Sequence, residues 1–95
     1  MAINANIDSL PVRALEQGGL STLQTIARQS RSPGGRPTIP SVARHNNCSR
    51  STHEIVAGLE FAGFVEADYV LYRVGQLRMT DAGWAQVGGK LQPHT

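Results

Sequence analysis

The chain has 95 residues, of which 40% are hydrophobic and 17% are charged, so it is long enough for one globular domain with a modest core. Aromatic residues make up only 5%, which disfavours a stacking platform for single-stranded nucleic acid. No apolar run approaches the roughly 20 residues of a membrane-spanning helix, and the N-terminal residues lack the pattern of a secretory signal. The single cysteine excludes an internal disulfide. We expect one cytoplasmic domain over residues 1–95.

The charges are unevenly distributed along the chain. Residues 17–53 contain no acidic residue and five arginines, which are Arg28, Arg31, Arg36, Arg44 and Arg50. This segment therefore carries +5, and the remainder, with four basic and seven acidic residues, carries −3, which gives the net charge of +2. A one-sided positive field favours a polyanionic partner, and arginine suits bidentate contacts to phosphate or guanine. The alternative is an ordinary solvated basic face.

Two helices are predicted before residue 30. Polar residues at positions 8 and 9 can cap a first helix, which stops at the Gly18-Gly19 pair. Ser21, followed three residues later by Gln24, predicts a capping box at the start of a second helix. Two prolines and two glycines predict a loop over residues 30–38. Arg36 in this loop could touch a phosphate backbone, and the simpler alternative is a soluble connector.

The segment 38–52, TIPSVARHNNCSRST, predicts two short helices joined by a tight turn. The third helix begins near Pro40 and ends at about Asn46, and the turn follows because asparagine tolerates left-handed backbone geometry. A fourth helix starts with Ser49 as its cap and ends at Gly63. Its apolar stripe at 3.6-residue spacing is Cys48, Thr52, Ile55, Val56, Leu59 and Ala62. Its opposite face carries Arg50, His53, Glu54, Ala57 and Gly58, which is how a helix-turn-helix presents side chains to the DNA major groove.

After residue 63 the pattern changes from helical to strand-like. β-branched and aromatic residues over 65–74 favour strands, and Gly75-Gln76 favours a turn. Leu77 and Met79 alternate with Arg78, as a strand with one buried face requires. A cap at residue 80 or 81 then predicts a last helix that carries Trp84 and ends at residues 88–89. We expect the tail, 88–95, to be flexible.

Four phrases in this order resemble the winged helix-turn-helix regulators of bacteria and phages, most closely the MarR-like style. They are Thr38, Ile39, Val42 and Ala43 at the start of the motif, S-R-S-T at 49–52, the phrase at 59–66, and Met79, Thr80 and Gly83. The resemblance covers about half of the chain, roughly residues 38–87. It implies an α+β winged helix-turn-helix fold, a small helical bundle with a C-terminal β-hairpin wing. The helix-turn-helix would occupy about 38–62 and the wing about 64–80.

The resemblance also implies a set of DNA-binding residues. Those facing bases or flanking phosphates would be Arg50, Ser51, His53 and Glu54. Ser49 or Thr52 would touch phosphate near the helix N-terminus. Arg73 or Arg78 would bring the wing to the minor groove or backbone, although acidic neighbours repel phosphate. Arg44 and Arg36 complete the set.

The sequence departs from the family pattern at the turn. Asn46 stands where leucine is usual, and His53 stands where valine is common. The fourth helix is also one residue shorter than usual. The long terminal helices with which MarR-like regulators dimerise have no counterpart, so the chain resembles a minimal module of that family.

Other chemistries have little support in the sequence. His45, Cys48 and His53 form H-x2-C-x4-H without a fourth ligand, so we expect a core cysteine beside two surface histidines and no metal. The acidic residues are scattered, and there is no nucleophile with a base and no phosphate-binding glycine loop. We therefore expect neither a cofactor nor an enzyme.

The expected function is sequence-specific binding of double-stranded DNA by a small bacterial or phage transcriptional regulator. It would insert the 49–62 helix into the major groove and act as a homodimer, joined through the first helix or the Trp84 helix. The alternative is a winged-helix module that binds another protein, or a DNA-targeting subunit of a larger assembly. The basic segment favours DNA, whereas Asn46, Gly58 and the acidic wing favour a protein partner.

Overall fold

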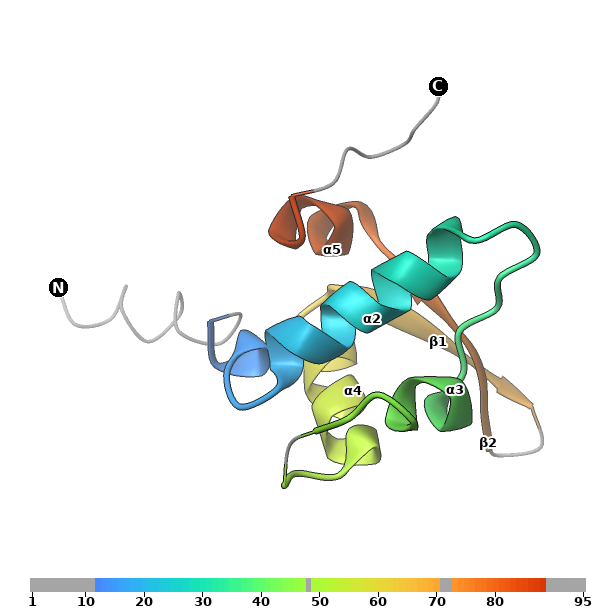
Figure 1. The fold of residues 1–95 in the computed structure, drawn as a ribbon. Coiled ribbons are helices and arrows are strands. Elements are labelled where there is room, and N and C mark those ends of the chain that lie inside the picture. Colours follow the sequence, from blue (N-terminus) through green and yellow to red (C-terminus); the bar gives the residue numbers. More distant parts are fainter. Residues whose placement is uncertain (1–11, 48, 71–72, 89–95) are drawn as a thin grey trace, which may run out of the picture.

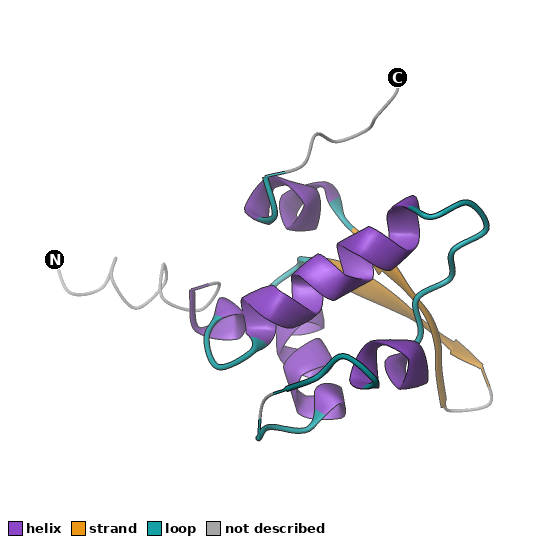
Figure 2. Cartoon of the chain, in the orientation of Figure 1, coloured by secondary structure: helices purple, strands orange, loops and turns teal. Residues whose placement is uncertain are grey.

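The computed structural model describes residues 12–47, 49–70 and 73–88, which form a small α+β fold with a two-stranded antiparallel hairpin. A helical turn over residues 12–15 is followed by α2 (Gly19–Arg31), α3 (Ile39–Ala43), α4 (Thr52–Phe61), β1 (Val65–Val70), β2 (Arg73–Met79) and α5 (Asp81–Gln86). Helix α2 crosses the front of the molecule, with α3 and α4 below it and α5 above it (Figure 1). The hairpin lies behind α2 (Figure 2). Within the described ranges, none of the helices has both the length and the apolar character needed to cross a membrane.

One hydrophobic cluster packs α2, the α3–α4 pair and the hairpin against one another. Its buried members are Leu23, Ile26, Ile39, Val42, Ile55, Val56, Leu59, Phe64, Val65 and Leu77. The stripe predicted for the fourth helix is confirmed at four positions, because Thr52, Ile55, Val56 and Leu59 are all buried. Ala62 packs against the cluster at its edge, and Cys48 lies outside the described residues.

Helix α2 begins two residues earlier than predicted, so the capping box expected at Ser21 and Gln24 is wrong. Its N-cap is Gly18, which has a left-handed φ of 94° and makes no side-chain capping bond. Gln17 and Gly18 both have positive φ, so the chain reverses direction there and the helix starts at once. The predicted cap of the first helix, at positions 8 and 9, lies outside the described residues.

Helix α3 is shorter than predicted and is capped by Thr38. The hydroxyl of Thr38 accepts from the N–H of Ser41, and the hydroxyl of Ser41 accepts from the N–H of Thr38, which completes a capping box. The helix ends at Ala43, where the predicted end was about Asn46. The N–H groups of His45 and Asn46 bond to carbonyls three residues back, so the chain tightens into a turn before position 46.

Helix α4 begins at Thr52, and its N-cap is Ser51, whose hydroxyl accepts from the N–H of Glu54 at 3.1 Å. The prediction that Ser49 caps this helix is therefore wrong, and so is the prediction that Arg50 and Ser51 belong to its first turn. The reason is a hydrogen bond from a side chain outside the helix. The side-chain amide of Asn46 donates to the carbonyl of Arg50 at 3.0 Å and keeps that residue in the loop.

The hairpin reverses direction between Val70 and Arg73, so the turn predicted at Gly75-Gln76 is wrong. Both residues lie inside β2. Gln76 forms an isolated antiparallel bridge with Thr38, so this stretch is held by a neighbour on its far side as well as by β1. The register pairs Ala67 with Leu77 and shifts between Ala67 and Tyr69, which marks an irregularity near Asp68.

The predicted alternation in β2 and the cap of α5 are confirmed. Leu77 is buried, Met79 is half-buried and Arg78 is exposed. The hydroxyl of Thr80 accepts from the N–H of Gly83 at 3.1 Å and donates to the carbonyl of Gly63 at 2.6 Å. Helix α5 ends at Gln86, two residues before the predicted end.

Candidate nucleic-acid interface

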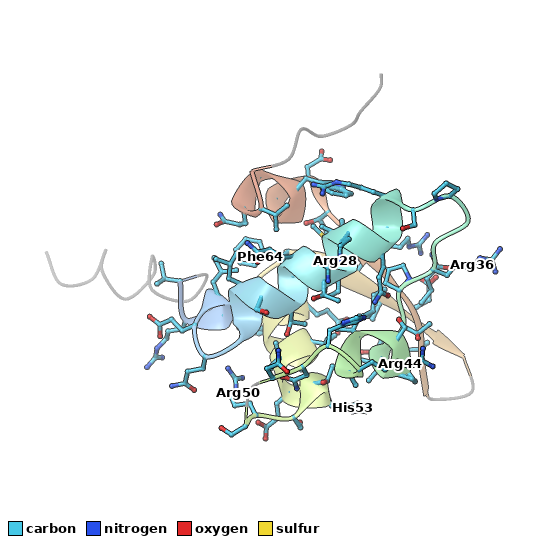
Figure 3. The ribbon with its side chains drawn as sticks, viewed as in Figure 1. Arg28, Arg36, Arg44, Arg50, His53 and Phe64 are labelled. Atoms are coloured by element: carbon cyan, nitrogen blue, oxygen red, sulfur yellow. The ribbon has the colours of Figure 1, made fainter. Side chains whose placement is uncertain are left out.

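Three of the predicted contact residues lie between the end of α3 and the first turn of α4. Arg44 is the C-cap of α3, Arg50 lies in the loop before α4, and His53 lies in the first turn of α4. Figure 3 shows all three along the lower part of the molecule. Arg44 and His53 are exposed, and the side chain of Arg50 is 31% exposed. We call Arg44, Arg50 and His53 the basic end.

The position of Arg50 is fixed by Asn46. The Nδ2 atom of Asn46 donates to the backbone carbonyl of Arg50 and to the hydroxyl of Thr52, which lies 2.9 Å away. Thr52 is only 6% exposed, so the amide connects the loop to the buried face of α4. One side chain therefore sets both where α4 starts and where the backbone of Arg50 lies.

The one acidic group at the basic end pairs with an arginine. Glu54 is the only acidic residue between positions 17 and 59, and its Oε1 lies 3.9 Å from Nε of Arg50. The Glu54 side chain is 68% exposed, so this is a weak surface ion pair that solvent screens. It places a donor-rich guanidinium and an acceptor carboxylate side by side at the start of α4. Both are side chains that can read base edges.

Three other predicted contacts occupy different environments. The hydroxyl of Thr52 accepts from Asn46 and Thr52 is only 6% exposed, so of the two alternatives, Ser49 or Thr52, the exposed Ser49 is the better placed for a phosphate. Ser51 is exposed, and its hydroxyl caps α4 while retaining its own proton for donation. Ser49 is exposed in the loop before the cap.

Three further arginines have side chains placed elsewhere, on the loop after α2, on the hairpin and beside α5. Arg36 projects from the loop after α2, away from the body of the molecule (Figure 3). Arg78 forms an ion pair with Asp68 on the hairpin. The backbone of Arg73 pairs with Val70, and its side chain lies outside the described part. The guanidinium of Arg31 lies 5.1 Å from the ring centre of Trp84, so it ties α2 to α5.

Asn46 is a site residue that the sequence reasoning did not select. The available indication was its departure from the usual leucine before the turn. A polar residue at a position that is half-buried needs hydrogen-bond partners, and those of Asn46 include the carbonyl of Arg50 before α4 and the hydroxyl of Thr52 at its start.

The zinc pattern H-x2-C-x4-H depends on Cys48, which lies outside the described residues. Its two histidines, His45 and His53, are exposed. Among the side chains that the structure describes, no group of three or more histidine, cysteine, aspartate or glutamate residues could hold a metal ion.

Comparison of the chain with models of known protein families, with curated proteins and with solved structures gave no match. The arrangement of the chain's own side chains is therefore the basis for assigning a function.

Proposed function

We propose that this protein binds double-stranded DNA as a winged helix-turn-helix module, with the exposed face of α4 in the major groove. The observation that carries the proposal is the basic end. Arg44, Arg50 and His53 come from a segment with no acidic residue, and they lie at the C-cap of α3, in the loop before α4 and in the first turn of α4. A polyanion is the partner that such a field favours.

The small residues on the exposed side of α4 suit close approach to the DNA major groove. Beyond its first turn, the exposed side carries the small residues Ala57 and Gly58, so the backbone can approach a surface closely. Its ten residues span about 15 Å, and an α-helix fits the width of the major groove. The side chains placed to read base edges are Arg50, His53 and Glu54, with Arg44 and the hydroxyl of Ser51 on phosphate.

The hairpin after α4 corresponds to the wing in this proposal, and its role is smaller. The pairing of Arg78 with Asp68 offsets the positive charge that the wing would otherwise bring to DNA. A single module of this size makes few contacts, so the proposal includes a homodimer that reads a two-fold site. The resemblance to bacterial and phage regulators favours a role in transcription.

Duplex DNA binding followed by fluorescence anisotropy, over a range of salt concentrations, tests the proposal. Contacts to about three to five phosphates per subunit predict a log–log salt slope of about −3 to −5, doubled for a dimer. Arg44→Ala should weaken binding to all sequences and reduce the slope by about 1. Arg50→Ala should cost about 1–3 kcal/mol on the preferred site.

The matched control is Arg13→Ala, because Arg13 is exposed and lies outside the acid-free segment. It removes the same charge and should leave binding nearly unchanged. A protein that shows no DNA binding at low salt, or that loses equal affinity with Arg13→Ala and Arg50→Ala, does not use the basic end for DNA.

A further inference from the structure

The outer edge of β1 is open to a further strand. In the described part of the sheet, β1 pairs with β2 and has no strand on its other side. The N–H of Leu77 in β2 donates to the carbonyl of Pro37 at 2.8 Å, so the backbone groups of Leu77 point away from β1. Its opposite residue, Ala67, therefore belongs to a non-hydrogen-bonded pair. The N–H and C=O of Ala67 point to the open edge. Val65 points the same way by alternation but is only 1% exposed, so its backbone groups are covered.

A groove of about 480 Å³ runs along this edge, between β1 and the end of α4. Its lining includes Ala67 and three acidic residues, Glu60, Glu66 and Asp68. Arg78 offsets the charge of Asp68, which leaves the groove negative. The charge of this surface is therefore opposite to that of the basic end.

An exposed aromatic residue stands on each of the two elements beside the groove. Phe61, at the end of α4, is 80% exposed, and Tyr69, on β1, is 58% exposed. The hydroxyl of Tyr69 donates to Glu60 at 3.1 Å, which links the two elements. Exposed phenylalanine and tyrosine side chains are enriched where proteins contact one another.

We propose that the groove beside β1 binds an extended, basic segment of a partner protein, which adds to the hairpin as a further strand. The open N–H and C=O of Ala67 supply main-chain hydrogen bonds, and Glu60 and Glu66 attract lysine or arginine side chains. A second copy of this chain is the weaker occupant. Pairing β1 with β1 would bring the acidic residues of both strands together, and like charges across a strand pair are destabilising.

The two binding surfaces lie at opposite ends of α4. Phe61 follows Thr52 by nine residues, which places it about 14 Å further along the helix axis. A partner on the β1 edge therefore leaves the basic end open, and the groove does not depend on DNA binding.

Titration of the isotope-labelled full chain with short peptides, followed by amide chemical shifts, tests this site. The probe is a peptide of alternating lysine and valine, and its control is a peptide of the same length with glutamate in place of lysine. We expect saturable shifts at Val65 and Ala67 with the lysine peptide, and affinity at least about tenfold lower for the glutamate peptide. Equal affinity for both peptides, or shifts confined to the basic end, would overturn the proposal.

Two variants separate main-chain from charge recognition. Ala67→Pro removes an N–H that the hairpin does not use, so peptide binding should be lost while far-UV circular dichroism is retained. Glu66→Lys keeps the backbone and should weaken the lysine peptide by about tenfold. DNA affinity should not fall in either variant, which separates this proposal from the previous one. Folded variants that bind the lysine peptide as tightly as the parent protein would contradict the proposal. Self-association that sedimentation detects and that Glu66→Lys abolishes would instead show that a second copy of the chain occupies the groove.

Discussion

The side-chain amide of Asn46 donates to the hydroxyl of Thr52 at 2.9 Å and thereby joins the end of the α3 turn to the first residue of α4. Thr52 is buried, so this bond satisfies a polar group inside the core. The same amide holds the carbonyl of Arg50. The polar residue at this position thus connects the end of α3 to the start of α4 by hydrogen bonds.

Asn46→Ala should destabilise the protein by about 1–3 kcal/mol, because it leaves the buried hydroxyl of Thr52 without this donor. It should also weaken DNA binding, since the backbone of Arg50 loses its anchor. Urea unfolding and anisotropy measure the two effects. Asn47→Ala is the matched control, because Asn47 is exposed and should change stability by less than about 0.5 kcal/mol. Equal stabilities of the two variants would show that the amide bonds contribute little.

Replacing either of two helical glycines by alanine should change the free energy of unfolding, in opposite directions at the two positions. A Cβ at Gly83 would lie 2.1 Å from the carbonyl oxygen of Phe64, so Gly83→Ala should push α5 off the hairpin and cost about 1–3 kcal/mol. A Cβ at Gly58 meets open space, so Gly58→Ala should stabilise α4 by about 0.5–1 kcal/mol. Thermal unfolding distinguishes them, and a shift of the same sign in both would contradict the packing of α5.

The N-cap of α4 can be located by a pair of serine variants. Ser51→Ala removes the acceptor for the N–H of Glu54 and should cost about 1 kcal/mol. Ser49→Ala changes an exposed loop residue and should be nearly neutral. Denaturant midpoints for the two variants provide the measurement. A larger loss for Ser49→Ala would place the helix start where the sequence pattern predicted it.

Tyr69 should ionise at a pH above its usual value of about 10. Its pKa is raised first by the hydrogen bond that it donates to Glu60, then by the negative charge of Glu60 and by desolvation. The neutral phenol is thus favoured in the folded protein. This contribution to stability is present below pH 10 and is lost as the pH rises through the raised pKa.

A tyrosinate absorbance titration measures the shift, with Tyr72→Phe as the background because the chain has two tyrosines. Glu60→Gln removes the charge and should lower the pKa of Tyr69 toward its usual value. An unchanged titration in Glu60→Gln would mean that the bond from Tyr69 to Glu60 is not formed in solution.

The sequence predicted correctly those elements whose apolar residues recur at a regular spacing or whose capping residue is adjacent in the chain. The buried stripe of α4 follows a 3.6-residue spacing, and Thr80 caps α5 from the adjacent position. Two of the helix and strand ends that were predicted wrongly depend on partners outside the local pattern. Ser49 loses the capping role because Asn46 reaches across the turn, and Gly75-Gln76 stays in β2 because Thr38 bridges to it.

The candidate site was predicted in part for the same reason. The charge pattern indicated Arg44 and Arg50, and the fold places both at the basic end. Charge along the chain does not show which arginines meet a partner inside the fold. Arg31 lies over Trp84 and Arg78 pairs with Asp68, and neither contact has a signature in the local sequence.

The bridge between Thr38 and Gln76 has a consequence for the order of folding. Thr38 caps α3, yet the strand residue that holds it is made 38 positions later. A contact between residues this far apart in sequence carries a loop-closure entropy cost that the local bonds of a helix do not. During synthesis, α3 therefore gains this attachment only after β2 has left the ribosome, so the start of α3 is secured among the last parts of the molecule.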